Sequence, residues 1–333
     1  MAVITVSKLR KRFNLEAGFF ARFGRFVDAV RGLSFSVDRN ESYGLVGESG
    51  CGKTTAARLL VRMYECDGGS IFFRDTIDVS ALKRRELEKY RQKVKYVFQD
   101  PARSLNPRMS VYEVLVSGYR WSPGAMSGER TGGHARFREK LAREEAGAIL
   151  EEVGLSRKDL EKRPPEFSGG QRQRVSIARG LIMKPDLLIC DEVVSALDVS
   201  IQGQILNLLL DIRERRGLSF LFIAHDLRVA CHFCDRIGVM YRGELMEEAP
   251  AADLWKTGSH PYTRLLFSSA PGLSPDAPAR DEGPPDSGAP SGGEGEERCS
   301  FAGRCPIATK QCLESRPPMR ETGCGHKTRC FNV

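Results

Sequence analysis

The fold is decided by the stretch Gly47-Glu48-Ser49-Gly50-Cys51-Gly52-Lys53-Thr54-Thr55, which has the spacing of a phosphate-binding loop. A short apolar run from Tyr43 to Val46 precedes this stretch and an apolar helical pattern follows it, as such a loop requires. The glycines let backbone N–H groups wrap phosphate oxygens, Lys53 reaches the β- and γ-phosphates, and Thr54 offers its hydroxyl to Mg²⁺. We therefore predict that the stretch binds a nucleotide.

An acidic strand end supplies chemistry that a phosphate loop lacks. The apolar run from Leu187 to Cys190 ends in Asp191 and Glu192. Asp191 is predicted to hold the water shell of the metal, and Glu192 to orient and deprotonate the attacking water. Acidic turns after strands are common, so this prediction depends on the phosphate loop being present in the same chain.

The alternation of short apolar runs with longer helical patterns predicts an α/β fold. The candidate strands are Tyr43 to Val46, Val94 to Phe98, Leu187 to Cys190, and Phe220 to Ala224. The polar groups that follow them are the loop from Gly47, Gln99, Asp191 with Glu192, and His225. Because ligands bind outside the carboxyl ends of parallel strands, these endings predict one shared site.

A second glycine-rich segment, Phe167-Ser168-Gly169-Gly170-Gln171, belongs to neither motif. It opens a helix with one apolar face, made of Val175, Ala178, Leu181 and Ile182. The N–H groups and the positive end of that helix form another anion site. Two phosphate sites in one chain make sense if the second serves the nucleotide of another molecule.

Composition and charge set the class of protein. The chain has 333 residues, 41% hydrophobic and 28% charged, and its 51 Lys and Arg against 43 Asp and Glu give a net charge of +8. That excess leaves nucleic acid, an anionic membrane face or an ordinary surface open, but no aromatic-interleaved basic run appears, so no nucleic-acid partner is expected. With no apolar run of bilayer length and no signal-peptide pattern, we expect a cytoplasmic chain.

The ten cysteines are expected to be structural or metal-binding in a cytoplasmic chain. Cys51, Cys66 and Cys190 fall inside the core pattern and are interpreted as small apolar fillers. Cys231 and Cys234 have Cys-x-x-Cys spacing but no second pair nearby. The tail gathers five more, Cys299, Cys305, Cys312, Cys324 and Cys330. Their spacing suits an iron–sulfur or a zinc site without separating the two.

The order of these motifs, together with Ser195-Ala196-Leu197-Asp198, resembles the ATP-binding subunit of ABC transporters. The resemblance implies a P-loop NTPase fold in which two such domains meet head to tail. The segment Ser168 to Gln171 of one domain would then close over the γ-phosphate held by the other. Asp198 would bridge the domains, and His225 would contact the γ-phosphate.

The same resemblance assigns two further residues. Gln99 would sense Mg²⁺, which Thr54 and Asp191 help to hold, and would touch the transmembrane partner. Phe13 matches the position at which the family stacks an aromatic ring on adenine, although it suits the core equally well and Tyr43 is nearby.

The resemblance narrows to the oligopeptide and dipeptide importers. It is carried by Gln99-Asp100-Pro101, Ser104-Leu105-Asn106-Pro107, Ser195-Ala196-Leu197-Asp198-Val199-Ser200 and His260-Pro261-Tyr262. In that subfamily the spacing Cys299, Cys305, Cys312, Cys330 implies a [4Fe–4S] cluster, with zinc as the alternative. The implied partners are transmembrane permease subunits, a second and usually different ATPase subunit, and an extracellular solute-binding protein, with this chain peripheral on the cytoplasmic face of the membrane. No physical reason for His260-Pro261-Tyr262 is evident from the sequence.

The predicted organisation follows from these matches: an α/β, P-loop NTPase domain of the ABC type, with a mixed sheet core, a helical subdomain and a small Cys-rich extension. The ATPase domain spans 1–254, with the helical subdomain at about 100–185. The extension starts at 255–271, a Pro-, Gly- and Ser-rich flexible linker covers 272–298, and the Cys-rich tail is 299–333.

Two departures from the family pattern stand out. Val193-Val194 replaces the usual Pro-Thr after Glu192, which puts coupling between the two sites in doubt, and Asn40 stands where glycine is usual. Every residue needed for hydrolysis is present, so we predict a competent ATPase. The alternatives are a soluble ABC ATPase acting on nucleic acid or the translation machinery, and an importer subunit for another solute such as nickel.

Overall fold

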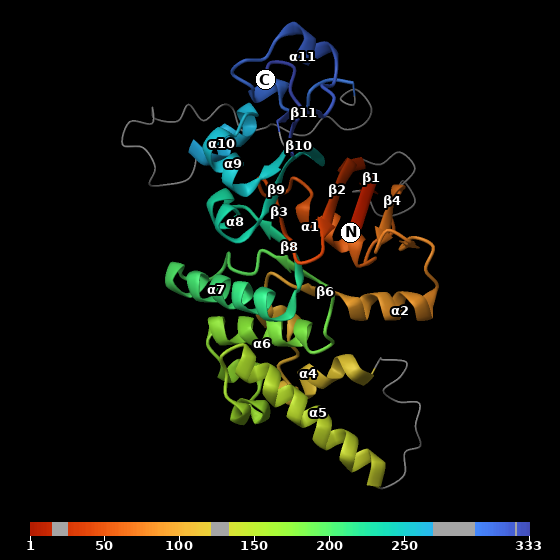
Figure 1. Cartoon of the computed structure of the whole chain (residues 1–333), viewed down its shortest axis with the longest axis vertical. Coiled ribbons are helices and arrows are strands. Elements are labelled where there is room, and N and C mark those ends of the chain that lie inside the picture. Colours follow the sequence, from red (N-terminus) through yellow and green to blue (C-terminus); the bar gives the residue numbers. More distant parts are fainter. Residues whose placement is uncertain (15–25, 121–132, 269–296, 324) are drawn as a thin grey trace. The chain divides into compact units, whose positions relative to one another are not determined.

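The computed structural model describes residues 1–14, 26–120, 133–268, 297–323 and 325–333 (Figure 1). The chain divides into two compact units. The first unit consists of Met1–Val3, Val37–Glu41 and Ile77–Phe222, and the second of Ile4–Ser36, Ser42–Thr76 and Ile223–Val333. Of the described helices, none combines the length and the apolar character that crossing a bilayer requires.

The second unit contains strands from two sheets. In the first sheet β1 lies between β2 and β4, and β1 pairs antiparallel with β4 (Figure 1). In the other sheet the order is β11-β12-β10-β9-β3, where β3 and β9 are parallel and the remaining pairs are antiparallel. The strands are β1 (Ala2–Asn14), β2 (Phe26–Asp38), β3 (Ser42–Val46), β4 (Gly68–Phe73), β9 (Arg236–Tyr241), β10 (Glu244–Pro250), β11 (Arg320–Gly323) and β12 (His326–Thr328). The helices are α1 (Lys53–Leu60), α8 (Leu227–Phe233), α9 (Ala251–Thr257), α10 (Pro261–Ser268), the 3₁₀ turn η4 (Ala302–Arg304) and α11 (Lys310–Glu314).

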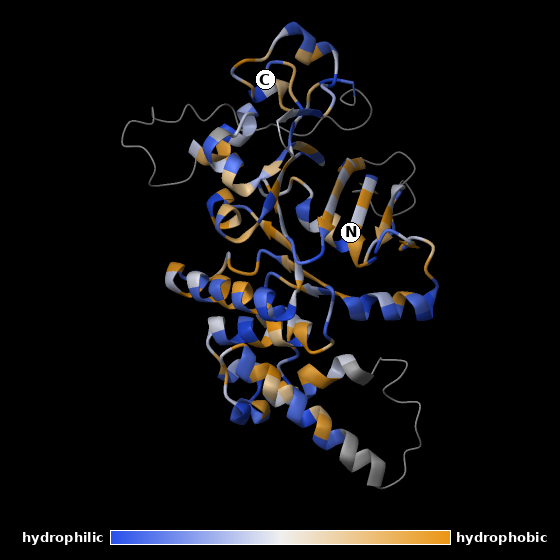
Figure 2. Ribbon diagram, in the orientation of Figure 1, coloured by the Kyte–Doolittle hydropathy of each residue, from blue (hydrophilic) through white to orange (hydrophobic). Residues whose placement is uncertain are grey.

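The first unit places helices around a parallel strand pair. Strands β6 (Val94–Val97) and β7 (Leu187–Asp191) are parallel, and β8 (Ser219–Ala224), most of which belongs to this unit, lies next to β7. These strands are strongly hydrophobic, whereas α2 is almost entirely hydrophilic and buries only Tyr90 (Figure 2). The remaining elements are β5 (Ile77–Asp78), α2 (Arg84–Lys93), α3 (Pro101–Ser104), α4 (Val111–Arg120), α5 (Gly133–Glu152), η2 (Arg157–Glu161), η3 (Pro164–Glu166), α6 (Gly169–Leu181) and α7 (Val199–Arg216).

The structure agrees with the predicted α/β class and with all four predicted strands, which are β3, β6, β7 and β8. Helices α3 to α6 fall inside the predicted helical stretch of about 100–185. The amino-terminal strands and the carboxyl-terminal strand pairs were not predicted. The linker predicted at 272–298 lies, except for its last two residues, outside the described residues.

The predicted boundary at residue 254 is not a boundary between the compact units, because the second unit runs from Ile223 to Val333. The reason is backbone pairing: β12 of the Cys-rich tail hydrogen-bonds antiparallel to β10, in the register Glu247 to Thr328 and Glu248 to Lys327. The tail therefore extends a sheet that begins in the predicted ATPase domain.

The turn after β2 explains one departure from the family pattern. Asn40 has a φ of 58°, in the left-handed region that glycine adopts freely and that asparagine tolerates better than other residues. Its N–H donates to the Ser219 hydroxyl at 2.8 Å, and its carbonyl accepts from Arg213 at 2.8 Å. Asparagine is therefore a residue that this left-handed turn accommodates.

We expect Asn40→Ala to lower the free energy of unfolding by about 1 kcal/mol, because alanine cannot adopt a positive φ cheaply. Asn40→Gly should be close to neutral. Arg39→Ala, in the same turn but without a positive φ, is the matched control and should change stability by less than about 0.5 kcal/mol. Urea denaturation measures all three, and equal effects of Asn40→Ala and Asn40→Gly would contradict the explanation.

Candidate functional site

The phosphate loop connects β3 to α1 in the second unit, as the sequence predicts. Two of its glycines admit no side chain. A Cβ at Gly47 would lie 2.1 Å from the Met240 carbonyl oxygen, and a Cβ at Gly52 would lie 2.0 Å from that of Ala29. Gly52 also has a φ of 105° and forms the N-cap of α1. The loop is therefore held against two neighbouring backbones.

Lys53 is the central charge of this loop. The side chain is only 4% exposed, and its ammonium donates to the Gly47 carbonyl at 2.7 Å and to the Glu48 carbonyl at 3.0 Å. An ammonium held inside the curve of a glycine-rich loop is suited to bind phosphate oxygens. Thr54 and Thr55 follow in the first turn of α1.

Cys51 fits its predicted role as a filler. Its thiol is buried, and burial raises its pKa although Lys53 nearby acts in the opposite direction. The Cys51 N–H donates to the Glu48 carbonyl at 3.2 Å and closes the loop. The thiol remains protonated at neutral pH and packs as a small apolar group.

Phe13 is better placed than Tyr43 to meet a base. Tyr43 is fully buried and stacks on Phe35, so its ring is part of the core. Phe13, near the end of β1, is half-buried, packs edge-to-face on Tyr64 with ring centroids 5.3 Å apart, and has the Lys11 ammonium 5.4 Å from its own centroid. That Phe13 stacks on adenine remains a prediction.

The acidic strand end lies in the first unit. Asp191 is 2% exposed and accepts a short hydrogen bond from the Tyr96 hydroxyl on the neighbouring strand β6. Glu192 accepts from the Gln99 amide at 2.7 Å. The two strand ends therefore bring together three of the predicted residues, as the shared edge of parallel strands requires. Tyr96 is a partner that sequence reasoning missed, and only the pairing of β6 with β7 reveals it.

Glu192 has a strained backbone. Its φ is 48°, which is unfavourable for a residue other than glycine and costs of order 1–3 kcal/mol. The Ser195 N–H and hydroxyl donate to the Glu192 carbonyl at 3.1 and 2.9 Å and hold this turn, while Val193 and Val194 are buried. Such strain is concentrated at functional sites, and the carboxylate of this residue is the one that binds Gln99.

The second glycine-rich segment begins helix α6, as predicted. Ser168 is the N-cap, and it exchanges side-chain hydrogen bonds with Gln171 in a capping box. A Cβ at Gly170 would lie 2.8 Å from the Ile201 side chain on α7, so this glycine lets the two helices approach. Ser168, Gly169 and Gln171 are exposed, which leaves the helix end open to a ligand or partner.

Asp198 and His225 are both exposed. Asp198 is the N-cap of α7, yet its side chain makes no capping hydrogen bond. His225 follows β8 directly and belongs to the second unit with the phosphate loop and Phe13. Gln99, Asp191, Glu192, the Ser168 segment and Asp198 belong to the first unit.

The four tail cysteines chosen from the spacing lie close together. Burial, and then the charges of Cys312, Cys305 and Cys330, raise the pKa of the Cys299 thiol, and the same kinds of interaction raise that of Cys305. The Cys299 N–H donates to the Cys312 carbonyl at 3.0 Å. Within the described part of the chain, however, no group of three or more His, Cys, Asp or Glu side chains has a geometry that would hold a metal ion. Cys324 lies outside the described residues.

Two residues at the phosphate loop were missed because they come from the carboxyl-terminal extension. The Tyr262 hydroxyl accepts the Glu48 N–H at 3.0 Å, and the Arg304 guanidinium binds the Glu48 carboxylate. That N–H therefore has Tyr262 as its hydrogen-bond partner. The His260-Pro261-Tyr262 motif was the only sequence signal, and its partner is far away in the chain.

Two family profiles match the chain. The profile described as "ABC transporter" matches residues 30–195, and the one described as "Oligopeptide/dipeptide transporter, C-terminal region" matches residues 246–312. The first range contains the phosphate loop, Gln99, the Ser168 segment, Asp191 and Glu192.

Relatives match almost from end to end. A putative peptide import ATP-binding protein of Brucella ovis is 43% identical over 304 residues, which cover 90% of each chain. The oligopeptide transport ATP-binding protein AppF of Bacillus subtilis is 38% identical over 330 residues, which cover 98% of this chain and 96% of AppF.

Solved structures agree on the fold. A dimeric ATP-binding cassette in a post-hydrolysis state with ADP and Pi superposes with a TM-score of 0.61 at 26% identity, covering 74% of this chain and 98% of that one. This confirms the predicted P-loop NTPase fold of the ABC type. The chain therefore belongs to the ABC transporter ATPases and carries the carboxyl-terminal region of the oligopeptide and dipeptide transporters.

Proposed function

We propose that this chain hydrolyses ATP to drive an importer of oligopeptides or dipeptides. The observation that carries the proposal is the combination of a complete hydrolytic set in one chain with the oligopeptide/dipeptide transporter region at 246–312. Relatives at 38% to 43% identity are named as peptide or oligopeptide transport ATP-binding proteins, which supports the same substrate class.

A few side chains share the work of binding and hydrolysing ATP. The phosphate loop and Lys53 bind the triphosphate, with Phe13 against the adenine. Glu192, oriented by Gln99, accepts the proton of the attacking water, which is typically worth about 10²- to 10⁴-fold in rate. His225 contacts the γ-phosphate.

Mg²⁺ fits the oxygen-rich donor set of this chain. The Thr54 hydroxyl, the Asp191 carboxylate and the Gln99 amide oxygen would hold the ion or its waters, and the ion would neutralise charge on the phosphates. The Tyr96 hydroxyl fixes the orientation of the Asp191 carboxylate by its hydrogen bond.

A second ATPase domain completes the site. The N-terminus of α6, from Ser168 to Gln171, is exposed and suited to bind an anion. It belongs to the first unit, whereas the phosphate loop of this chain belongs to the second. We place it, with Asp198, against the nucleotide of a second ATPase subunit, which is a different chain in the arrangement we favour.

The remaining partners follow from transport. Permease subunits would provide the membrane path, and an extracellular solute-binding protein would deliver the peptide. The chain would then be peripheral, bound to the permease on the cytoplasmic face of the membrane.

The tail cysteines would hold a [4Fe–4S] cluster through Cys299, Cys305, Cys312 and Cys330, with zinc as the alternative occupant. Cysteine thiolates are the ligands of such clusters, and zinc accepts the same donors. After burial, the neighbouring tail cysteines are among the groups that raise the pKa of Cys299 and Cys305, which is a sign of how close together the four thiols lie.

Glu192→Gln should lower the steady-state ATPase rate by at least about 100-fold while ATP still binds, because the amide cannot accept the proton of water. Glu214→Gln, an exposed position on α7, is the matched control and should hydrolyse ATP normally. Phosphate release and equilibrium binding of a fluorescent ATP analogue measure the two properties. Wild-type turnover in Glu192→Gln would contradict the assignment of the base.

The importer itself is tested in cells. Deleting the gene should abolish uptake of a labelled tripeptide, and wild-type protein, but not the Glu192→Gln variant, should restore it. Affinity isolation from detergent-solubilised membranes should recover multi-span membrane subunits with this chain. Unchanged peptide uptake with lost nickel uptake, or steeply salt-dependent nucleic-acid binding without a membrane partner, would reject the proposed substrate class.

For the tail, protein prepared without air should absorb visible light and contain iron, and Cys312→Ser should lose both properties. Cys66→Ser, which changes a cysteine outside the tail, is the control and should keep them. Zinc without iron would favour the alternative occupant. Protein with neither metal would reject a metal site in the tail.

A further inference from the structure

The phosphate-loop residue Glu48 is bound from two directions by the carboxyl-terminal extension. Tyr262 binds its backbone N–H, and Arg304 binds its carboxylate. Both contacts lie within the second unit. We propose that Tyr262 and Arg304 are positioning residues for ATP, which fix the phosphate loop and cancel the negative charge of Glu48 beside the triphosphate. The proposal rests on nucleotide binding by the loop, which is part of the proposed function.

The Tyr262 contact depends on a buried, neutral histidine. Tyr262 is fully buried and its own N–H donates to His260 Nδ1 at 3.0 Å. Burial lowers the pKa of His260 to about 4, although Glu247 and the Arg329 backbone act in the opposite direction. The ring is therefore uncharged at neutral pH, so Nδ1 is able to accept the Tyr262 N–H. This gives the His260-Pro261-Tyr262 motif a physical role: the histidine orients the tyrosine, and the tyrosine holds the loop.

The Arg304 contact is a bidentate ion pair. Nη1 and Nη2 of Arg304 lie 2.8 and 2.9 Å from the two carboxylate oxygens of Glu48. This hydrogen bonding raises the pKa of the already strongly basic Arg304. The guanidinium also lies over the rings of Tyr241 and Phe301, with centroid distances of 5.8 and 5.9 Å, which restricts its rotamers.

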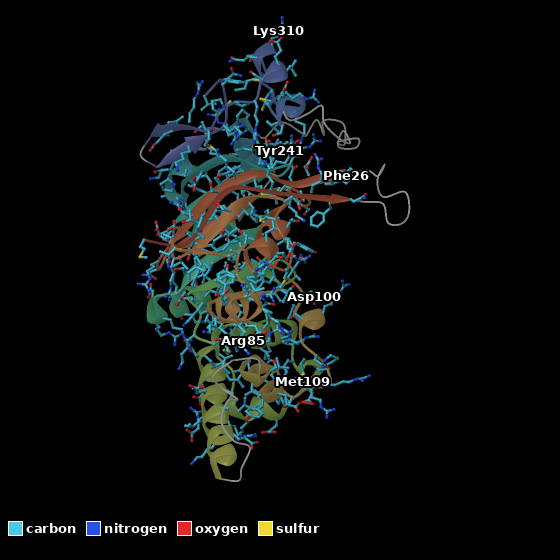
Figure 3. All side chains as sticks on the ribbon, turned by 90° about the vertical axis from the view of Figure 1, so that its right-hand side faces the viewer. Phe26, Arg85, Asp100, Met109, Tyr241 and Lys310 are labelled. Carbon is cyan, nitrogen blue, oxygen red and sulfur yellow. The ribbon has the colours of Figure 1, made fainter. Side chains whose placement is uncertain are left out.

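The tail fixes where Arg304 lies. Arg304 ends the 3₁₀ turn η4, which is flanked by Cys299 and Cys305 and closed by hydrogen bonds from the Ala302 N–H to the Cys299 carbonyl and from the Arg304 N–H to the Phe301 carbonyl. Tyr241 lies on β9, below the tail, whereas Lys310 lies at the outer tip of the tail (Figure 3).

Buried carboxylates on β10 attach the same segment to the core of the unit. Glu247 is fully buried and accepts from the Ser259 and His260 N–H groups at 2.7 and 3.1 Å and pairs with the His326 ring at 2.6 Å. Glu244 accepts from the Ser300 hydroxyl at 2.9 Å and pairs with Arg316 at 2.9 Å. A rearrangement of the tail would therefore move both Arg304 and the His260 motif.

The charge of Glu48 matters because ATP is a polyanion. The charge of the Glu48 carboxylate acts on other groups of the loop. After burial, it is among the causes that raise the pKa of Cys51. Without Arg304, this carboxylate would repel the phosphates and would be able to compete for Lys53. The Arg304 and Glu48 side chains are 34% and 39% exposed, so salt should screen the repulsion.

Arg304→Gln should raise the Kd for ATP about 3- to 5-fold at low salt, with kcat nearly unchanged. The defect should shrink as salt rises, and adding Glu48→Gln should restore binding, because the uncompensated carboxylate is then gone. Arg320→Gln, which removes an exposed charge from β11 of the same tail, is the matched control and should bind ATP normally.

Tyr262→Phe keeps the buried ring and removes only the hydroxyl. The Glu48 N–H then loses its partner, and the Kd for ATP should rise about 5-fold in a manner independent of salt. Thermal melting of each variant checks that the tail remains folded. The contrast in salt dependence separates the two roles, since general loosening of the fold would affect both variants alike.

The proposal is overturned if both variants melt normally and bind ATP like the wild type, or if Glu48→Gln fails to restore binding to Arg304→Gln. Lys53→Ala tests the proposed function separately, because it removes the central phosphate ligand of the loop. If the wild type itself binds no ATP, the proposed function fails. If the wild type binds ATP and only Lys53→Ala loses it, the loop functions without help from the extension.

Discussion

The phosphate loop packs against two neighbouring backbones, which approach it at glycines where no side chain intervenes. The carbonyls of Met240 and Ala29 lie where a Cβ of Gly47 or Gly52 would stand. These contacts fix the loop against β9 and β2, so its curve is set by the packing of strands rather than by the loop alone. The Lys53 side chain lies inside this curve, where its ammonium donates to two carbonyl groups of the loop.

A second constraint is the backbone conformation of Glu192, the residue proposed as the catalytic base. A positive φ at glutamate is unfavourable, and the Ser195 contacts and the burial of Val193 and Val194 stabilise it. Val193 and Val194, which stand where the family usually has Pro-Thr, are therefore part of the packing around this turn, whose carboxylate accepts from Gln99. Asn40 also has a positive φ, at a position where glycine is usual.

Local rules predicted the parts of the fold that local physics decides. Buried parallel strands appear as continuous apolar runs, and β3, β6, β7 and β8 were found on that basis. The start of α6 was predicted because the glycine-rich segment precedes the apolar helical face of Val175, Ala178, Leu181 and Ile182, whereas the capping box of Ser168 and Gln171 was not predicted. The strands β1 and β2 were not predicted from the sequence, although β1 contains four buried apolar residues, Val3, Ile4, Val6 and Leu9. Their patterns are interrupted, by a bulge between Ser7 and Arg10 in β1, and no polar strand end drew attention to them.

The contacts around Glu48 lay beyond any such rule, because its partners are 214 and 256 residues away. Nothing local in His260-Pro261-Tyr262 indicates a hydrogen bond to a phosphate loop, and Arg304 resembles an ordinary surface charge between two cysteines. Both become informative only when β12 pairs with β10 and brings the tail into the second unit. Treating the tail as a separate module, as the sequence suggested, hides this connection. A carboxyl-terminal segment that supplies both a buried hydroxyl and a guanidinium to one loop residue is therefore packed against the loop itself, and the two cannot be described as separate modules of the second unit.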